Sequence, residues 1–542
     1  MKRNFLFVFF AVIAATISAA EPAQGIAYYK AGFPQVAKPL LLKEYATDTL
    51  TRSETCFYLG NIYFGENKVD SAEIYFKKGL IGKQVNVLNT IGLAMLKMKS
   101  NLKDADADII AVLKLPASRK NPDYSIAAAN AYLFNGLIEQ ATNYMEKAKS
   151  IKLKYSALAV LAGDIEFAKK DVGKACGNYD MAILYDENCK EAYIKYARAY
   201  KNVNTPLAIE MLNRLKQKEP TFLLADKELA DIYYANNDFD KAAQLYANYL
   251  KSGNSSVSDL TKYAMTMFLN KDYTKSLEIS KMGLQKDSHN PAFNRLAMYN
   301  NVALEKYNDA IKYADLFFNK SDNPDISYYD YTYYGQALRS TKQYDLAIEQ
   351  FKKALKLDST QIGFWKDISD MYGEKPDYPN QISNYIIYMN ALAPEKKTAD
   401  IILNLGKMYY SLGNLETSTA DIKKSSLLKA DSIFGQVASL EPTAYRGNMW
   451  RARTNFALDP ESTIGLAKPF YEQTVTLVEA KADVRYNPVI LECSRYLGYY
   501  YFLKKDYVQS KIYWNKILLI DSKNELALKA IEGIDKALKG KK

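Results

Sequence analysis

The sequence contains little of what catalytic and metal-binding sites are made from. Its 542 residues include one histidine, four cysteines and three tryptophans. It shows no CxxC pair or Cys/His spacing typical of zinc sites, no glycine-rich phosphate loop, and no GxSxG or HExxH motif. These absences predict a protein that is not an enzyme and that has no catalytic residue, no metal site and no cofactor.

The few cysteines also argue against a fold held by disulfides. Cys176 and Cys189 are the only pair close in sequence, whereas Cys56 and Cys493 are remote. About ten helical residues separate Cys176 from the turn before Cys189, a rise of about 15 Å, and a disulfide spans at most roughly 7 Å between Cα atoms. We therefore expect the cysteines to act as small apolar side chains. A Cys176–Cys189 bridge stays open as an alternative if the chain doubles back.

Long apolar runs are absent except at the N-terminus. Lys2 and Arg3 precede an apolar stretch over residues 5–17, and residues 18–20 (Ser-Ala-Ala) form a small-residue cleavage site. This pattern predicts a signal peptide over residues 1–20. An uncleaved anchor is the alternative, although a run of about 13 residues is short for a membrane helix. We expect an exported protein, either periplasmic or outer-membrane-associated or secreted, with no integral membrane segment after cleavage.

Runs of like charge are missing as well, although the net charge is +11. Basic and acidic residues are interspersed along the chain, apart from a loose basic run at Lys539, Lys541 and Lys542. An interspersed excess of this kind favours acidic protein partners and does not predict nucleic-acid binding.

A motif that returns about every 34 residues dominates the sequence. A small residue in the middle of each presumed first helix serves as a marker, and six of the twelve marker spacings are 33 or 34 residues. A partial unit around Gly25 precedes the first marker, which gives about 14 units in all. The markers are Gly60, Gly92, Ala129, Gly163, Ala197, Ala230, Ala264, Met298, Gly335, Ser369, Gly406, Ala452 and Gly498.

The presumed second helix of each unit carries a small residue followed four positions later by a second residue, which is usually large. Examples are Ala72 with Phe76 and Ala347 with Phe351. The spacing of four places both on one helix face, where the small residue admits a neighbouring helix and the large one fills the adjacent hole. The repeat therefore predicts stacked helical hairpins, which bury their apolar faces only against neighbours.

The period lengthens near the C-terminus, where two consecutive spacings reach 46 residues. We interpret residues 21–410 as a regular array of repeats. Residues 411–542 are interpreted as a similar array with lengthened helices and loops, ending in a capping helix over residues 525–539. Insertions of this kind often decorate one face of a solenoid, but harmless loop variation is the alternative.

These motifs resemble the tetratricopeptide repeat (TPR) family. The best copies are Leu59-Gly60-x-x-Tyr63 with Phe76, residues 335–354, and Leu497-Gly498-x-x-Tyr501 with Trp514. The resemblance covers residues 25–540 and implies an all-α, right-handed α-solenoid of about 14 helix–turn–helix repeats. The C-terminal third, with residues 450–453 (Trp-Arg-Ala-Arg), is similar to exported repeat proteins of Bacteroidetes-type bacteria. Such proteins typically bind peptides or protein segments in a concave groove.

The residue after each marker, with those three or four positions away, is expected to line that groove. From residue 198 onward this set mixes cations with tyrosines, which suits an extended segment bearing carboxylates. The alternative is that these side chains form the solvated side of their helices. The candidate partner-binding residues are Arg198, Lys201, Lys227, Tyr234, Arg295, Tyr299, Gln336, Arg339, Lys407, Tyr410 and Arg453.

The sequence thus favours a non-catalytic scaffold or adaptor of the bacterial cell envelope. Its expected partner is an envelope protein or peptide segment that is acidic in character. A glycan-binding protein associated with the outer membrane is an alternative, as is a structural solenoid that assembles with itself. The scarcity of tryptophan and the lack of a lipid-attachment cysteine weigh against glycan binding.

Overall fold

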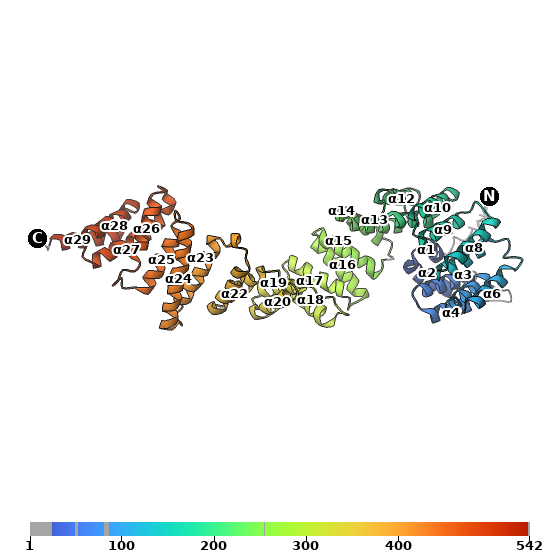
Figure 1. Ribbon diagram of the computed structural model, residues 1–542, viewed down its shortest axis with the longest axis horizontal. Coiled ribbons are helices and arrows are strands. Elements are labelled where there is room, and N and C mark those ends of the chain that lie inside the picture. Colours follow the sequence, from blue (N-terminus) through green and yellow to red (C-terminus); the bar gives the residue numbers. More distant parts are fainter. Residues whose placement is uncertain (1–23, 49–51, 81–85, 254, 540–542) are drawn as a thin grey trace, which may run out of the picture. The chain divides into compact units, whose positions relative to one another are not determined.

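The computed structural model describes residues 24–48, 52–80, 86–253 and 255–539, shown as a ribbon in Figure 1. The predicted signal peptide lies outside these residues. Within them the secondary structure is helical throughout, and α1–α28 form successive pairs before a last helix, α29. The expected all-α solenoid of helical hairpins is therefore confirmed. No helix in the described ranges combines the length and apolarity needed to cross a membrane.

The chain divides into two compact units, residues 1–300 and 301–542. The helices of the first unit are α1 (Gln24–Lys30), α2 (Pro34–Thr47), α3 (Arg52–Gly65), α4 (Val69–Lys78), α5 (Val87–Lys97), α6 (Leu102–Leu113), α7 (Pro122–Phe134), α8 (Ile138–Ile151), α9 (Ser156–Ala168), α10 (Val172–Tyr185), α11 (Lys190–Tyr200), α12 (Thr205–Lys218), α13 (Leu224–Ala235), α14 (Phe239–Leu250), α15 (Val257–Leu269) and α16 (Tyr273–Lys286). Helix α17 (Pro291–Ala303) contains the boundary.

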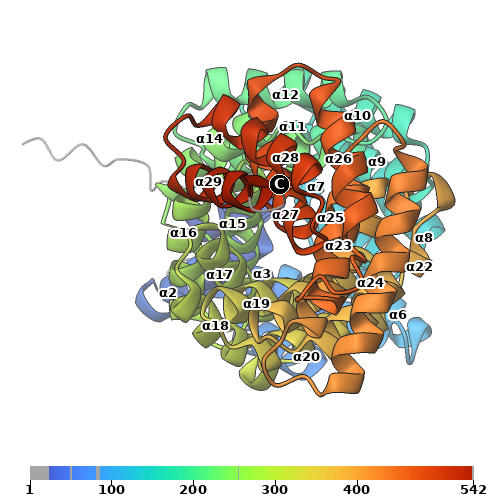
Figure 2. The same ribbon diagram turned by 90° about the vertical axis from the view of Figure 1, so that its left-hand side faces the viewer.

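The second unit includes the longest helix of the described chain, α24. Its helices are α18 (Tyr307–Lys320), α19 (Tyr328–Ser340), α20 (Tyr344–Leu357), α21 (Gly363–Glu374), α22 (Tyr378–Ala391), α23 (Ala399–Gly413), α24 (Ala420–Leu440), α25 (Arg446–Leu458), α26 (Lys468–Glu479), α27 (Asn487–Leu503), α28 (Tyr507–Ile520) and α29 (Glu525–Lys539). Short 3-10 turns occur at Pro394–Lys396 and Val484–Tyr486. Figure 2 views this unit from the side of α25–α29.

The interlock of marker residues with aromatic rings explains why consecutive helices pair. A Cβ placed on Gly163 of α9 would lie 2.3 Å from the ring of Tyr179 on α10, and one on Gly406 of α23 would lie 2.4 Å from the ring of Phe434 on α24. The ring thus occupies the space that a side chain at the marker would need. A single hairpin cannot cover these rings by itself. Their burial between neighbouring helices therefore supplies most of the stabilisation of the array.

The turn inside a pair is also encoded locally. Asn237, Lys271 and Lys505 have left-handed backbones, with φ of 60°, 63° and 60°. An aspartate follows each of them and caps the second helix; the carboxylate of Asp272, for example, accepts a hydrogen bond from the backbone N–H of Lys275 at 2.9 Å. Capping satisfies a backbone donor that the helix itself leaves unpaired.

The four cysteines are free. Cys56, Cys176 and Cys493 are buried in the helix seams, and burial raises the pKa of the Cys176 thiol to about 11. A thiol held neutral in this way behaves as a small apolar side chain.

Candidate functional site

The first helices of the last hairpins, together with α29, enclose an apolar groove in the second unit. Its volume is about 880 Å³, and aromatic and aliphatic side chains dominate its walls. The groove is lined by Tyr410, Arg453, Phe456, Pro460, Tyr471, Glu492, Arg495, Tyr496, Tyr499, Phe502, Trp514, Leu526, Lys529, Ala530 and Gly533.

Helical periodicity directs these side chains to one side. On α27, Arg495, Tyr499 and Phe502 are separated by four and three residues, so they share one helix face. On α29, Lys529 and Ala530 lie three and four residues after Leu526, so these three also share one helix face and line the groove. Tight packing behind α27 fixes its position, since Gly498 lies directly against the Trp514 ring of α28.

Arg453 of the groove lining also contacts the ring of Trp450, which lies outside that lining. Three of the sequence-predicted residues contact its ring: the Arg453 guanidinium and the Lys407 ammonium lie 5.0 Å and 5.4 Å from the ring centre, and the Tyr410 ring centre lies 5.4 Å away. Cations over the face of an indole are attracted by its quadrupole. A smaller cavity of about 330 Å³ shares Arg453 with the groove, and its lining includes Asn404, Lys407 and Trp450.

Some charged side chains in and beside the groove are paired and others are not. Arg453 donates two hydrogen bonds to the Glu492 carboxylate, at 2.8 Å and 2.7 Å, and these bonds raise the pKa of its guanidinium. Arg495, by contrast, is exposed and makes no hydrogen bond or ion pair with any described residue, and Lys407 has no carboxylate partner among them. Arg495 is therefore a cation of the groove wall that no described acid neutralises, and Lys407 is a second such cation in the smaller cavity.

Large apolar side chains are exposed here. Phe456 is 42% exposed, Tyr499 47% and Leu526 53%. Clusters of exposed apolar side chains framed by polar ones mark interaction sites in soluble proteins.

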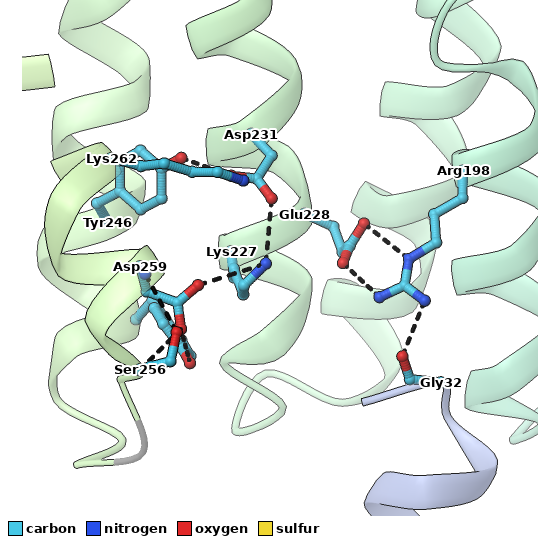
Figure 3. Close-up of polar contacts among 10 residues, drawn as sticks. Gly32, Arg198, Lys227, Glu228, Asp231, Tyr246, Ser256, Asp259 and Lys262 are labelled. Atoms are coloured by element: carbon cyan, nitrogen blue, oxygen red, sulfur yellow. Dashed lines mark hydrogen bonds and ion pairs between the residues drawn. The ribbon is translucent and has the colours of Figure 1, made fainter. Parts of the chain in front are cut away.

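The predicted residue Arg198 is engaged within the first unit (Figure 3). Its guanidinium donates to the Glu228 carboxylate at 3.1 Å and 2.6 Å and to the Gly32 carbonyl at 2.9 Å, and it lies 4.7 Å from the centre of the Phe33 ring. Gly32 has a left-handed φ of +81°, and a Cβ there would lie 2.8 Å from Arg198 Nη1. The turn between α1 and α2 is thus fastened to α11 and α13. The ring centre of Phe33 also lies 6.2 Å from that of Phe222, just before α13.

Lys227 is likewise occupied (Figure 3). Its ammonium lies 3.1 Å from Asp231 and 3.5 Å from Asp259. Although burial acts in the opposite direction, these carboxylates and that of Glu228 raise the pKa of the Lys227 ammonium. Asp231 also accepts hydrogen bonds from Tyr246 at 2.5 Å and from the Lys262 ammonium at 2.9 Å. This network joins α13 to α14 and α15.

The other predicted residues do not form a common site. Lys201 and Gln336 are exposed, and Tyr299 is buried against the Phe268 ring. Tyr234 is partly buried 5.9 Å from the Phe239 ring centre, and Arg339 pairs with Asp367 at 3.1 Å. Arg295 is partly buried on α17. In the described structure only Lys407, Tyr410 and Arg453 are brought together, around the Trp450 ring.

Sequence reasoning missed the core of the groove, although a signal for it was present. The positions around the marker Gly498 that follow the same spacing rule are Arg495, Tyr499 and Phe502, and all three line the groove. Leu526 carries no comparable signal, because its exposure to the groove depends on how α28 and α29 close the end of the array. The described residues contain no group of three or more histidine, cysteine or acidic side chains arranged to hold a metal.

Comparison with known proteins agrees with this architecture. The sequence model of the tetratricopeptide repeat family matches residues 331–361, which comprise most of α19 and all of α20. The chain therefore contains a tetratricopeptide repeat and has the α-solenoid fold that such repeats build. No curated protein matches it in sequence. The presence of such repeats indicates, in general terms, a scaffold for protein–protein interactions.

Several solved structures resemble parts of the chain. The C-terminal part of a TPR repeat-containing protein from Cytophaga hutchinsonii is 28% identical, with 50% of this chain and 99% of that chain covered and a TM-score of 0.39. The Cut9–Hcn1 hetero-tetramer of APC/C gives 16% identity, coverage of 91% and 92%, and a TM-score of 0.30. A tetratricopeptide repeat protein from Parabacteroides merdae gives 16% identity, coverage of 46% and 98%, and a TM-score of 0.31.

Proposed function

We propose that this protein is a non-catalytic scaffold of the bacterial cell envelope, and that its second unit holds an extended protein segment in the groove of α23, α25, α27 and α29. The observation that carries the proposal is the apolar groove of about 880 Å³ with Arg495 on its wall, a cation that pairs with no described residue. The envelope assignment rests on the signal-peptide pattern of residues 1–20.

The chemistry of the groove defines its occupant. Exposed Phe456, Tyr499 and Leu526 provide surface for apolar side chains of the segment. Arg453, Arg495 and Lys529 outnumber Glu492, the one acid of the lining, so the groove carries a net charge of 3 − 1 = +2. A guanidinium binds a carboxylate through two parallel hydrogen bonds. The segment that fits therefore alternates apolar or aromatic side chains with aspartate or glutamate.

Selection of displayed peptides on the immobilised mature chain tests this proposal. Random peptides bound by the wild-type protein are expected to be enriched in acidic residues adjacent to aromatic or aliphatic ones. Arg495→Glu should weaken the selected peptides by about tenfold or more, because it replaces a charge-assisted hydrogen bond by repulsion. Lys352→Glu, a charge reversal at an exposed residue of α20 outside the groove, is the matched control and should leave binding unchanged.

Arg495 is exposed and makes no hydrogen bond or ion pair with any described residue, so the variant should retain the wild-type helical circular dichroism. The proposal fails if selection yields no enriched pattern. It also fails if the selected peptides bind Arg495→Glu and Lys352→Glu equally well.

A further inference from the structure

The first unit contains a second cavity, separate from the groove of the second unit. Its volume is about 720 Å³, and its walls are the facing sides of α3, α5, α7, α9 and α11. The turn between α1 and α2 lies along one side of it, since Tyr29, Lys30, Gly32 and Pro34 belong to the lining. The Arg198 bond to the Gly32 carbonyl fastens that turn in place.

The charge of this cavity is opposite to that of the whole chain. Its lining has two ammonium groups, from Lys30 and Lys195, and four carboxylates, so its net charge is 2 − 4 = −2, whereas the chain carries +11. The carboxylates belong to Glu54, Asp123, Asp164 and Glu191.

The internal ammonium groups neutralise only part of this charge. Lys195 bridges Asp164 at 2.5 Å and Glu191 at 2.7 Å. Asp123 accepts a hydrogen bond from the Tyr155 hydroxyl at 2.6 Å, which leaves its charge uncompensated. Glu54 is partly exposed to the cavity and has no hydrogen bond or ion pair with any described residue.

Aromatic rings stand beside the uncompensated acids. The rings of Tyr29 and Tyr58 lie 5.0 Å apart between their centres, and the Lys30 ammonium already lies 5.6 Å from the centre of the Tyr58 ring. Burial, followed by the charges of Glu54 and other nearby acids, raises the pKa of Tyr58, which places its phenol within the field of the carboxylates. Aromatic faces next to carboxylates form a favourable environment for an ammonium or guanidinium group.

We propose that this cavity docks a basic protein segment by taking up one of its lysine or arginine side chains between Glu54, Asp123 and the Tyr58 ring. The long methylene chain of such a residue packs against the apolar lining, which includes Phe57 and Ile91, while its charged end reaches the carboxylates. An acidic segment, which fits the groove of the second unit, is repelled here. The inference concerns a different unit and a ligand of opposite charge, so it does not depend on the proposed function above.

Isothermal titration calorimetry of the full mature chain tests the docking. The probes are a blocked hexapeptide of sequence Gly-Ala-Lys-Ala-Ala-Gly, its arginine analogue and a matched peptide with norleucine at the central position. Binding of the lysine or arginine peptide is expected, and the norleucine peptide should bind about tenfold more weakly or not at all, because it lacks the charge-assisted hydrogen bonds.

Variants locate the site. Glu54→Gln should weaken the lysine peptide about tenfold, since it removes the least compensated carboxylate without breaking a hydrogen bond or ion pair to any described residue. Asp123→Asn, which can still accept the Tyr155 bond, should act in the same direction. Glu139→Gln, at an exposed residue of α8 outside the cavity, is the matched control and should bind like the wild type.

The docking inference is overturned if neither peptide binds, if norleucine binds equally well, or if Glu54→Gln behaves like Glu139→Gln. Spermidine serves as a further probe, which tests whether the cavity binds a free polyamine. If spermidine binds in a Glu54-dependent manner while the peptides do not, the cavity takes a free polyamine and the docking of a protein segment is refuted.

Discussion

Replacement of Arg198 by alanine is expected to destabilise the first unit locally and strongly. In the structure the Arg198 guanidinium holds three groups together: the Glu228 carboxylate, the Gly32 carbonyl and the Phe33 ring. The side chain of Glu228 is 11% exposed and that of Arg198 36%. The truncation therefore leaves a nearly buried carboxylate without its partner and releases the turn that leads into α2.

The size of the effect follows from that partial burial. Breaking a fully buried ion pair costs about 3–5 kcal/mol, and an exposed pair is worth about 0–1 kcal/mol. The lost bond to the Gly32 carbonyl adds about 1 kcal/mol, because water replaces it in part. We expect a local destabilisation of about 2–4 kcal/mol for Arg198→Ala. Lys201→Ala, at an exposed position one helical turn away, should stay within about 0.5 kcal/mol of the wild type.

Hydrogen exchange measured by mass spectrometry resolves the local effect, which a single unfolding curve of a repeat protein does not. Amides of α1 and α2, residues 24–47, should exchange about 30-fold faster or more in Arg198→Ala, as a loss of about 2 kcal/mol implies. A Glu228→Ala variant and the double variant complete a mutant cycle, in which the two losses should not add. Equal exchange over residues 24–47 in Arg198→Ala and Lys201→Ala would refute the role assigned to Arg198.

Two further predictions concern packing and pH. Gly163→Ala should lower the free energy of unfolding, measured in urea, by about 1–2 kcal/mol, because the overlap of the new methyl group with the Tyr179 ring outweighs the gain of about 1 kcal/mol in helix propensity. At Gly335 the methyl group would lie 3.0 Å from the Phe351 ring, so Gly335→Ala should cost less. Equal costs for the two variants would contradict the packing of marker residues against aromatic rings. Although burial opposes it, neighbouring ammonium groups hold the pKa of Asp231 below its usual 3.8, so the ionised form stabilises the fold above that value and the stabilisation is lost as the pH falls through the lower folded pKa. Urea midpoints measured from about pH 6 to about pH 3 should therefore fall less for Asp231→Asn than for the wild type, and parallel curves would show that Asp231 contributes nothing to acid sensitivity.

The periodic part of the fold was predictable because it depends on residues close in sequence. The spacing of small markers such as Gly60 and Gly163, and the pairing of Ala347 with Phe351, indicated hairpins that the structure confirms. Each hairpin is specified within about 34 residues, so no long-range information is needed to recognise it. The same local rule, applied around Gly498, leads to residues of the candidate groove.

The charge state of the candidate site was not predictable in this way. Arg198 and Arg495 both occupy positions that the marker rule assigns to the groove, one residue after Ala197 and three residues before Gly498. Arg198, however, is bound by Glu228 and by a turn 166 residues away, whereas Arg495 has no partner among the described residues. Which cation is free depends on the acids that neighbouring helices bring to it. The position of a residue relative to its marker predicts which side of the helix it lies on. It does not predict which charged side chains the neighbouring helices place opposite it.

The sequence by itself determined the repeat, the helical hairpins and the approximate side of each helix that faces the groove, because these follow from periodicities of three to four residues and about 34 residues. Only the tertiary structure decided that α1 and α2 fold back onto α11 and α13, that most predicted cations are already paired, and that two cavities of opposite charge result. The physical reason is that ion pairing and cavity shape depend on distances of a few ångströms between side chains from different repeats. Those distances are set by the accumulated stacking of many helices, which no single repeat encodes.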